Sequence, residues 1–409
     1  MAIAALAAPA TASAHARLVR TEPASGAVLT SPPSRFVAVF DDTVRVGPGN
    51  AAVRNGGASV LAGTPSAHGR MLVLPLRPHL AHGAYSVRWS VISEDGHDVQ
   101  GVLAFAVGAG QPVPEPTLHP AGETGVGTLL TRWLFFTGLL LAGGVAFFDL
   151  VVWRPLAHSG LPTSWIAVGL ATMFVSGQGL VHASHAGTAT RFGIVVEISA
   201  AASAAGATAA AIAIADRTAA PFALALALAA LPVPTLAGHS LDPGRSWIDA
   251  PLDLLHVTAA AVWLGGILAL ALIVPRLRAP SGLAAAAARR FSRIALASVL
   301  VVGATGVGRA LAELSAVSQL WTTSYGEVIV VKTALFGLLL VLGWTSRSLL
   351  ASARVRYSVS AELAVLLGLV AAVALLTALP PGRQANPSSP SGRADGETVR
   401  RATEIAPAG

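Results

Sequence analysis

Eight apolar stretches, each long enough to cross a bilayer, follow one another from residue 126 onward. A helix needs about 20 apolar residues to span the hydrocarbon core, so each stretch predicts a transmembrane helix. Of the 409 residues, 54% are hydrophobic and only 11% are charged, whereas soluble domains are roughly 25% charged. The sequence therefore predicts an all-α polytopic membrane bundle, with spans at 126–152, 164–182, 192–214, 219–238, 251–274, 294–313, 327–346 and 359–379.

The segment before these spans, residues 15–108, has a different pattern. Short runs in which apolar and polar residues alternate are separated by turns rich in Gly, Pro, Asn and Ser, which is typical of half-buried strands. We expect a small antiparallel β-sandwich, with strands at 35–40, 70–76, 84–92 and 101–107. A Pro-rich linker at 109–124 would connect it to a membrane domain at 125–380.

Arginine distribution predicts the orientation in the membrane. The connections between the predicted spans carry Arg191 and Arg245 on the sandwich side, and nine arginines on the other side. Cytoplasmic loops are enriched in Lys and Arg, so the sandwich and a polar tail, 381–409, are expected outside the cytoplasmic membrane. The tail's composition predicts disorder. We attribute the net charge of +7 to this topology rather than to nucleic-acid binding.

The N-terminus carries a possible metal chelate. Residues 12–14 read Ala-Ser-Ala, and signal peptidase cleaves after Ala-x-Ala, so residues 1–14 are expected to be a removed signal peptide. Cleavage would make His15 the first residue, with an amino group and an imidazole side by side. The sequence has no cysteine and three methionines, which excludes thiolate ligands and a methionine-rich soft-metal site.

A second group of metal-binding side chains lies in the turn 93–101, where Asp95 and His97 flank Gly96. If the turn curls around an ion, their oxygen and nitrogen atoms can converge. Together with an amino-terminal nitrogen they form a tetragonal N/O set, which favours Cu(II). A solvated hairpin turn is the alternative, because Asp-Gly is a common turn dipeptide.

The polar half resembles the CopC copper-binding domain. The resemblance rests on "HARLVRTEPASGAVLTSPPSRFVAVFDDTV" (15–44) and "LAHGAYSVRWSVISEDGHDVQGVLAFAVG" (80–108). It implies a Greek-key sandwich in which Cu(II) is held by the N-terminal His15 with Asp95 and His97. The methionine-rich Cu(I) site of some family members has no counterpart here.

Four histidines cluster at the predicted outer ends of spans: His182, His185, His239 and His256. Ionisable residues at membrane depth indicate function by default, although His182 and His185 fit an interfacial position equally well. The segments "AGHS…PLDLLHVTAAAVWLGG" and "RRFSRIALASVLVVGATGVGRA" (289–310) resemble the CopD membrane family. The whole chain thus resembles fused CopC–CopD proteins, which are associated with copper uptake or copper resistance.

These observations lead to three hypotheses. In the first, the exported domain captures Cu(II) and the membrane histidines pass copper inward, with an external reductant if it crosses as Cu(I). In the second, the protein sequesters copper or delivers it to a copper-accepting partner without transport. In the third, the protein is an oxidase with an N-terminal His copper site. Asp95 would then block the open coordination position on the copper ion, so we expect no enzyme. The chain has no nucleotide-binding loop, so it does not by itself couple transport to ATP.

Overall fold

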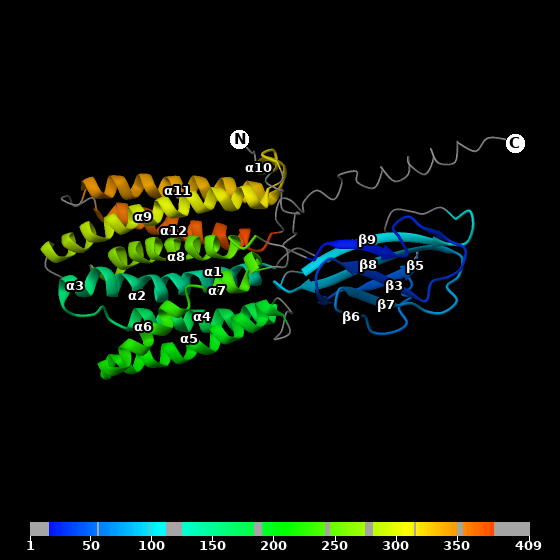
Figure 1. Ribbon diagram of the computed structural model, residues 1–409, viewed down its shortest axis with the longest axis horizontal. Helices are drawn as coiled ribbons and strands as arrows, with labels where there is room; N and C mark the ends of the chain where they lie inside the picture. Colours follow the sequence, from blue (N-terminus) through cyan, green and yellow to red (C-terminus); the bar gives the residue numbers. More distant parts are fainter. Residues whose placement is uncertain are drawn as a thin grey trace, which may run out of the picture.

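The computed structural model describes residues 16–54, 57–96, 98–111, 125–183, 190–241, 246–274, 281–314, 316–349 and 355–379. Figure 1 shows an all-β part at one end and a bundle of helices at the other. The predicted signal peptide, most of the predicted linker and the predicted tail lie outside the described residues. The two expected fold classes, a β-sandwich followed by a membrane-type helical bundle, are confirmed.

The β part consists of two sheets. One sheet has the order β1-β3-β7-β6 and the other β2-β9-β8-β4, with β5 also paired to β8. The strands of the first sheet are β1 Leu18–Glu22, β3 Arg35–Phe40, β6 Ser66–His68 and β7 Met71–Pro75. Those of the second are β2 Val28–Leu29, β4 Val44–Val46, β5 Ala51–Arg54, β8 Gly83–Ser93 and β9 Asp98–Val107.

Aromatic side chains fill the space between the sheets. Phe40 and Trp89 pack edge to face with ring centroids 5.4 Å apart, and Tyr85 stacks on Phe105 at 5.4 Å. The four predicted strands correspond to β3, β7, β8 and β9. The expectation of a purely antiparallel sandwich is wrong at one place, because β2 pairs with β9 in parallel. β2 has only two residues and is not joined to β9 by a hairpin turn, so the connection does not require the two strands to run antiparallel.

All eight predicted spans contain a helix. Six described helices are long and apolar enough to cross a membrane: Val126–Ala157, Ser164–Ala183, Arg191–Ala215, Asp249–Ile273, Gly282–Leu311 and Ser324–Thr345. Two shorter apolar helices, Arg217–Ala229 and Ala361–Leu376, occupy the other two positions.

In detail, the first span runs through α1 Val126–Leu139, α2 Val145–Phe148 and α3 Arg154–Ala157, joined by π-helical turns. The others are α4 Ser164–Ala183, α5 Arg191–Ala215, α6 Ala220–Ala229, α7 Val233–Ala237, α8 Asp249–Leu268, α9 Ser281–Glu313, α11 Ser324–Leu349 and α12 Val355–Leu376, with the short α10 Gln319–Thr322 before α11.

The fourth predicted span is not one continuous helix. It divides into α6 and α7, and a 3-10 turn, η5 His239–Leu241, comes after them. Pro232 and Pro234 lie at the break. Proline has no N–H to donate and its ring clashes with the preceding turn, so it interrupts an α-helix. The break leaves η5 at the end of the bundle nearest the sandwich (Figure 1).

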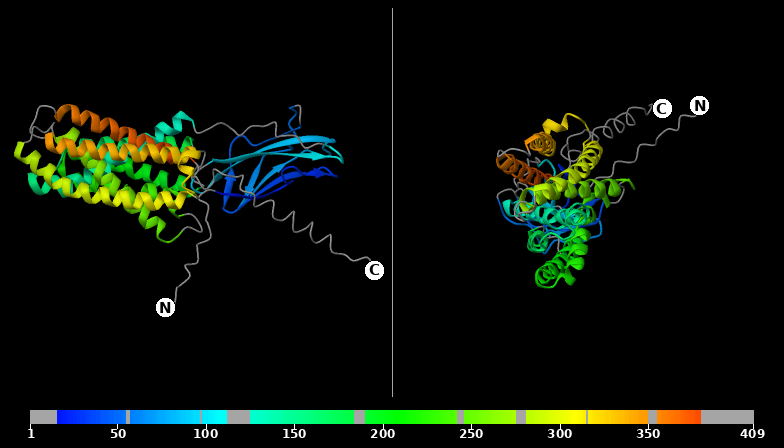
Figure 2. Two further views of the ribbon diagram at one scale, coloured as in Figure 1. Left: turned by 90° about the horizontal axis from the view of Figure 1, so that it is seen from above. Right: turned by 90° about the vertical axis from the view of Figure 1, so that its left-hand side faces the viewer.

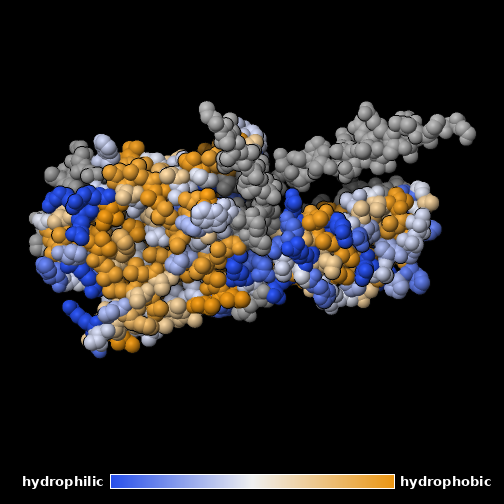
Figure 3. Space-filling view, viewed as in Figure 1, coloured by the Kyte–Doolittle hydropathy of each residue, from blue (hydrophilic) through white to orange (hydrophobic). Residues whose placement is uncertain are grey.

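The bundle surface has the pattern of a membrane protein. On the face shown in Figure 3, apolar residues cover the middle of the bundle, and hydrophilic residues gather at the far end and at the end next to the sandwich. Figure 2 shows the sandwich continuing the long axis of the bundle rather than covering its side. The apolar band is therefore left open along the helices, as a bilayer requires.

Candidate functional site

The turn that carries Asp95 joins the two longest strands. β8 ends at Ser93 and β9 begins at Asp98, so residues 94–97 connect the two strands, at the place that the sequence predicts. The side chain of Asp95 is buried, with the residue 2% exposed, and its Oδ1 accepts a hydrogen bond from Ser93 Oγ. Gly96 has a φ of +80°, in the left-handed region where a side chain is strained.

The same turn is docked on the membrane part, at the start of α5. The backbone N–H of Phe192 donates to the Glu94 carbonyl over 3.2 Å, and that of Arg191 donates to the Glu94 carboxylate over 3.2 Å. The first N–H groups of a helix lack partners within it and favour a negative charge, so Glu94 caps α5 from the other domain. A Cβ atom on Gly96 would lie 2.7 Å from Phe192 Cγ, which shows how closely the surfaces meet.

An arginine of α1 also faces the turn. The Arg132 guanidinium interacts electrostatically with Asp95. Its Nη1 donates to the carbonyl of Thr377, just after α12, while its buried Nε has no hydrogen-bond partner among the described residues. Asp95 therefore lies between a serine of its own strand and a cation of the bundle.

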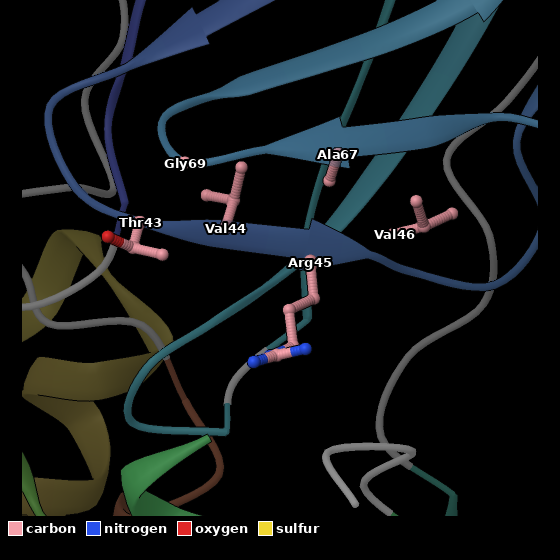
Figure 4. Close-up of a pocket in the computed structure, with 6 residues that line it drawn as sticks. All are labelled: Thr43, Val44, Arg45, Val46, Ala67 and Gly69. Carbon is pink, nitrogen blue, oxygen red and sulfur yellow. The ribbon is translucent and has the colours of Figure 1, made fainter. Parts of the chain in front are cut away.

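The other two proposed ligands of this site, His15 and His97, lie outside the described residues. Among the residues that are described, no group of three or more His, Cys, Asp or Glu side chains is arranged to hold a metal ion. The three-ligand Cu(II) site therefore stays a prediction. A hollow in the sandwich beside β4 is not a second candidate, because its lining includes no carboxylate or imidazole: Thr43, Val44, Arg45, Val46, Ala67 and Gly69 (Figure 4).

Arg191 connects the docked turn to the segment of His239. Its guanidinium donates to the carbonyl of Gly238 over 2.8 Å and to that of Leu241 over 3.2 Å. Gly238 and Leu241 lie on either side of His239 in the sequence, and His239 is the first residue of η5. One residue thus holds the sandwich turn with its backbone and the His239 segment with its side chain.

Of the other two membrane-face histidines, His182 lies at the end of α4. His182 is exposed in the last turn of this helix, and His185 falls outside the described residues. The predicted shared helical face of His182 and His185 stays a prediction, because His185 is not among the described residues.

From η5, polar contacts continue into the bundle. Ser240 Oγ donates to Asp253 Oδ2 over 3.3 Å, and Asp253, 6% exposed, forms an ion pair with Arg309 of α9. Asp253 and His256 are three residues apart in α8, so both lie on one face of that helix. The contacts therefore lead from the turn, through η5, to the neighbourhood of His256.

His256 is held by α9. Its Nδ1 lies 2.8 Å from Thr305 Oγ1, and the Thr305 hydroxyl donates to the Val301 carbonyl over 2.6 Å. A hydroxyl has a single proton, so we assign Nδ1 as the donor to Thr305, which places the imidazole lone pair on Nε2. Lys332 of α11 lies within electrostatic reach of His256, and Arg309 within reach of Lys332.

Sequence reasoning missed several residues of this network, namely Glu94, Arg132, Arg191 as a link, Ser240, Asp253, Thr305 and Arg309. One signal was available, because Arg191 and Arg245 are the two arginines that the predicted topology leaves in the outer connections. Most of the others carry no sequence signal, since their partners lie far away in the chain.

Comparisons with known proteins agree with this architecture. Residues 18–108 match the CopC domain family, and residues 285–376 match the family described as Copper resistance protein D. Copper transport protein CutJ of Bacillus subtilis is 26% identical over 413 residues, covering 91% of this chain and 75% of CutJ. Protein YobA of Escherichia coli is 31% identical over 98 residues, which are 23% of this chain and 79% of YobA.

Two solved structures align with the sandwich. CopC from Methylosinus trichosporium OB3b is 26% identical, with a TM-score of 0.21, and covers 26% of this chain and 100% of its own. PcoC, a methionine-rich copper resistance protein from Escherichia coli, is 22% identical, with a TM-score of 0.20, and covers 23% and 98%. The chain thus carries a CopC domain followed by a CopD domain, and it is similar to CutJ over 91% of its length.

Proposed function

We propose that this protein binds Cu(II) outside the cytoplasmic membrane and passes copper inward through its helical domain. In the mature protein, residues 15–108 form the copper-binding domain, with His15, Asp95 and His97 as ligands. Residues 125–380 form the membrane domain, in which His239 and His256 receive the ion, with His182 and His185 nearby. The protein is not an enzyme: copper is its cargo.

One observation carries this proposal. The turn with Asp95 is hydrogen bonded to the start of α5, and the same residue of α5 holds the carbonyls on either side of His239. Copper bound at the turn would therefore already lie against the membrane domain. A freely tethered sandwich would have to find that surface by diffusion for each ion.

The names of the relatives agree with a copper role of this kind. CutJ is a copper transport protein, and the second matched domain family is described by copper resistance. Import and resistance share the capture step and differ in where the captured copper goes, so measurements of cellular copper decide the direction of movement.

A different observation favours the second candidate function, copper sequestration or delivery without transport. Lys332 of α11 acts electrostatically on His256, and Arg309, which pairs with Asp253, acts on Lys332. In a low-dielectric interior the positive charge of Lys332 raises the free energy of a copper cation at His256. Under this alternative, copper stays at the sandwich or leaves with an external partner.

Cellular copper content separates the two functions. The strain would lack its own protein of this family and would express the wild type, Asp95→Asn, or His239→Ala with His256→Ala, at equal membrane levels. His68→Ala, an exposed histidine of β6, is the matched control. Import predicts that the wild type and H68A raise cytoplasmic copper while the other two variants do not.

If cytoplasmic copper is the same in every strain while membrane-associated copper falls only with D95N, the protein binds copper without importing it. If D95N leaves the Cu(II) electron paramagnetic resonance spectrum of the purified protein unchanged, Asp95 is not a ligand and the proposed capture site is wrong.

A further inference from the structure

Arg191 occupies the only described position where one residue contacts both the docked turn and the His239 segment. It is the first residue of α5, and Thr190 caps the helix by accepting a hydrogen bond from Gly193 N–H over 3.0 Å. This cap fixes the direction in which the first turn of the helix points. The Arg191 backbone N–H donates to Glu94, while its side chain donates to the carbonyls of Gly238 and Leu241, on either side of His239.

The chemistry of the contact suits arginine in particular. The guanidinium is a planar fork with five donors, so it can bind two acceptors that are fixed relative to each other. Here the two acceptors are backbone carbonyls of Gly238 and Leu241, at 2.8 and 3.2 Å. Lysine would bring the same charge as a single point, without the fixed fork. Because both acceptors are uncharged backbone carbonyls, the contact fixes the position of η5 and does not neutralise the charge of Arg191.

The segment that Arg191 holds has little helical structure of its own. α7 has five residues and η5 has three, because prolines interrupt the fourth span. Short helices are marginal without tertiary contacts. The position of η5 relative to the turn thus depends on side-chain contacts, of which Arg191 supplies two and the Ser240–Asp253 hydrogen bond a third.

We propose that Arg191 is a positioning residue for copper transfer: it holds the His239 segment against the copper-binding turn. Copper binding at the turn then changes the backbone mobility of η5, and copper passes from the turn to η5 without release to water. This inference rests on the proposed function for the transfer step. The coupling between the turn and η5 is a property of the structure and can be measured without transport.

The test compares Arg191→Met, Arg191→Lys and the matched control Arg217→Met, which removes an exposed arginine just beyond the other end of α5. Met keeps the length of the side chain and removes the donors. Three measurements are made on the full chain: the Cu(II) electron paramagnetic resonance spectrum, backbone hydrogen exchange at 238–241 with and without Cu(II), and the initial rate of copper uptake as external copper is varied.

We expect the Cu(II) spectrum of R191M to equal that of the wild type, because the backbone contact to Glu94 remains. Copper loading should slow exchange at 238–241 in the wild type and R217M and have no effect on exchange in R191M. The maximum uptake rate of R191M should fall about tenfold, as expected when donor and acceptor sites lose their alignment, while the half-saturating copper concentration stays the same. R191K should recover part of the rate.

The outcomes distinguish the positioning role of Arg191 from the proposed import of copper. If copper loading slows exchange at 238–241 in the wild type and not in R191M, but no strain takes up copper, the positioning role stands and the import proposal fails. If R191M matches R217M in both exchange and maximum rate, the inference about Arg191 is wrong, whatever the protein transports. A change in the Cu(II) spectrum of R191M would also overturn it, since Arg191 would then act on the copper site itself.

Discussion

His256 Nδ1 lies 2.8 Å from Thr305 Oγ1, a hydrogen bond that joins α8 to α9 within the bundle. Because the Thr305 hydroxyl donates to its own helix, it accepts from the imidazole and selects the tautomer that carries the lone pair on Nε2. A partner of this kind fixes both the orientation and the ligand atom of a metal-binding histidine. Thr305 is thus part of any site that His256 forms.

Thr305→Val tests this arrangement. Valine keeps the shape of the side chain and removes the acceptor, so the imidazole loses its fixed tautomer and orientation. We expect copper transfer through the membrane domain to fall about tenfold, the lower end of the effect of losing such a partner. Thr333→Val is the control, because Thr333 is exposed on α11 and its hydroxyl bonds only the Ile329 carbonyl in the described contacts. Equal uptake in T305V and T333V would contradict a role for His256.

The sandwich should have a pH limit set by Tyr85. This side chain is 1% exposed, and its hydroxyl donates to the Ala81 carbonyl over 2.6 Å. Burial raises the pKa of Tyr85 above its usual value of 10.0, an effect that the nearby Arg54 partly offsets. The neutral phenol is therefore favoured in the folded state.

It follows that Tyr85 contributes stability that is complete below pH 10, where the unfolded tyrosine is still neutral, and is lost as the pH rises toward its folded pKa. Hydrogen exchange in the peptide 83–93 should accelerate above pH 10 beyond the intrinsic base catalysis of exchange. Tyr85→Phe should remove this pH dependence and cost about 1 kcal/mol at neutral pH, through the lost hydrogen bond. The same excess acceleration in Y85F would assign the pH limit to another group.

The sequence predicts the sandwich best where strands are long. Alternation over six or more residues identifies the strands at 35–40 and 84–92, but β2 and β4 have two and three residues, too few to show a period. Hydropathy finds all eight spans for a similar reason, since each needs many apolar residues. What hydropathy cannot detect is the break at Pro232 and its consequence, a separate η5 that carries His239.

For the candidate site, the sequence predicts the position of Asp95 in a turn between strands but not the docking of that turn. Glu94 and Arg191 are 97 residues apart, and His256 and Thr305 are 49 apart. Hydrogen bonds between such distant positions follow from how the domains and helices pack, and no local periodicity encodes them. The signal that remains is chemical: a charged side chain at the end of a span needs a partner.

Packing inside the bundle depends on the close approach of α8 to the π-helical turn Leu140–Gly144, which joins α1 to α2. A Cβ atom on Gly265 would lie 2.8 Å from the carbonyl carbon of Gly144 and 2.9 Å from the Leu140 oxygen. The two backbones therefore meet directly, as the Gly265-Gly266 pair in the sequence suggests.

We expect Gly265→Ala to destabilise the bundle by about 1–3 kcal/mol, the usual cost of overpacking. Thermal unfolding in detergent measures the effect. Gly303→Ala is the control, because a Cβ atom on Gly303 of α9 meets nothing within 4 Å in the described structure. If both variants melt at the wild-type temperature, the backbones of α8 and of the turn Leu140–Gly144 are not in contact.

The position of Arg132 leads to a prediction about copper affinity. Its guanidinium interacts with Asp95, the proposed copper ligand, and is anchored on the Thr377 carbonyl at the end of α12. A fixed positive charge competes with Cu(II) for this carboxylate and repels the ion. In the docked state the turn should therefore bind copper more weakly than it would without Arg132, which favours release toward the membrane domain.

Arg132→Met removes the competing charge, so Cu(II) affinity of the full chain should rise, by about tenfold if the effective dielectric constant is near 20. The gain should shrink little at high salt, because a buried pair is poorly screened. Arg290→Met is the matched control. Arg290 also donates to a backbone carbonyl, that of Val151 in the turn Asp149–Trp153 just before α3, and α3 lies at the end of the bundle away from the sandwich (Figure 1). Copper titration with a competing chelator measures both variants. Unchanged Cu(II) affinity in R132M would mean that Arg132 does not compete with copper for Asp95. A gain in affinity in R132M but not in R290M would indicate that docking of the turn on the bundle lowers its affinity for copper.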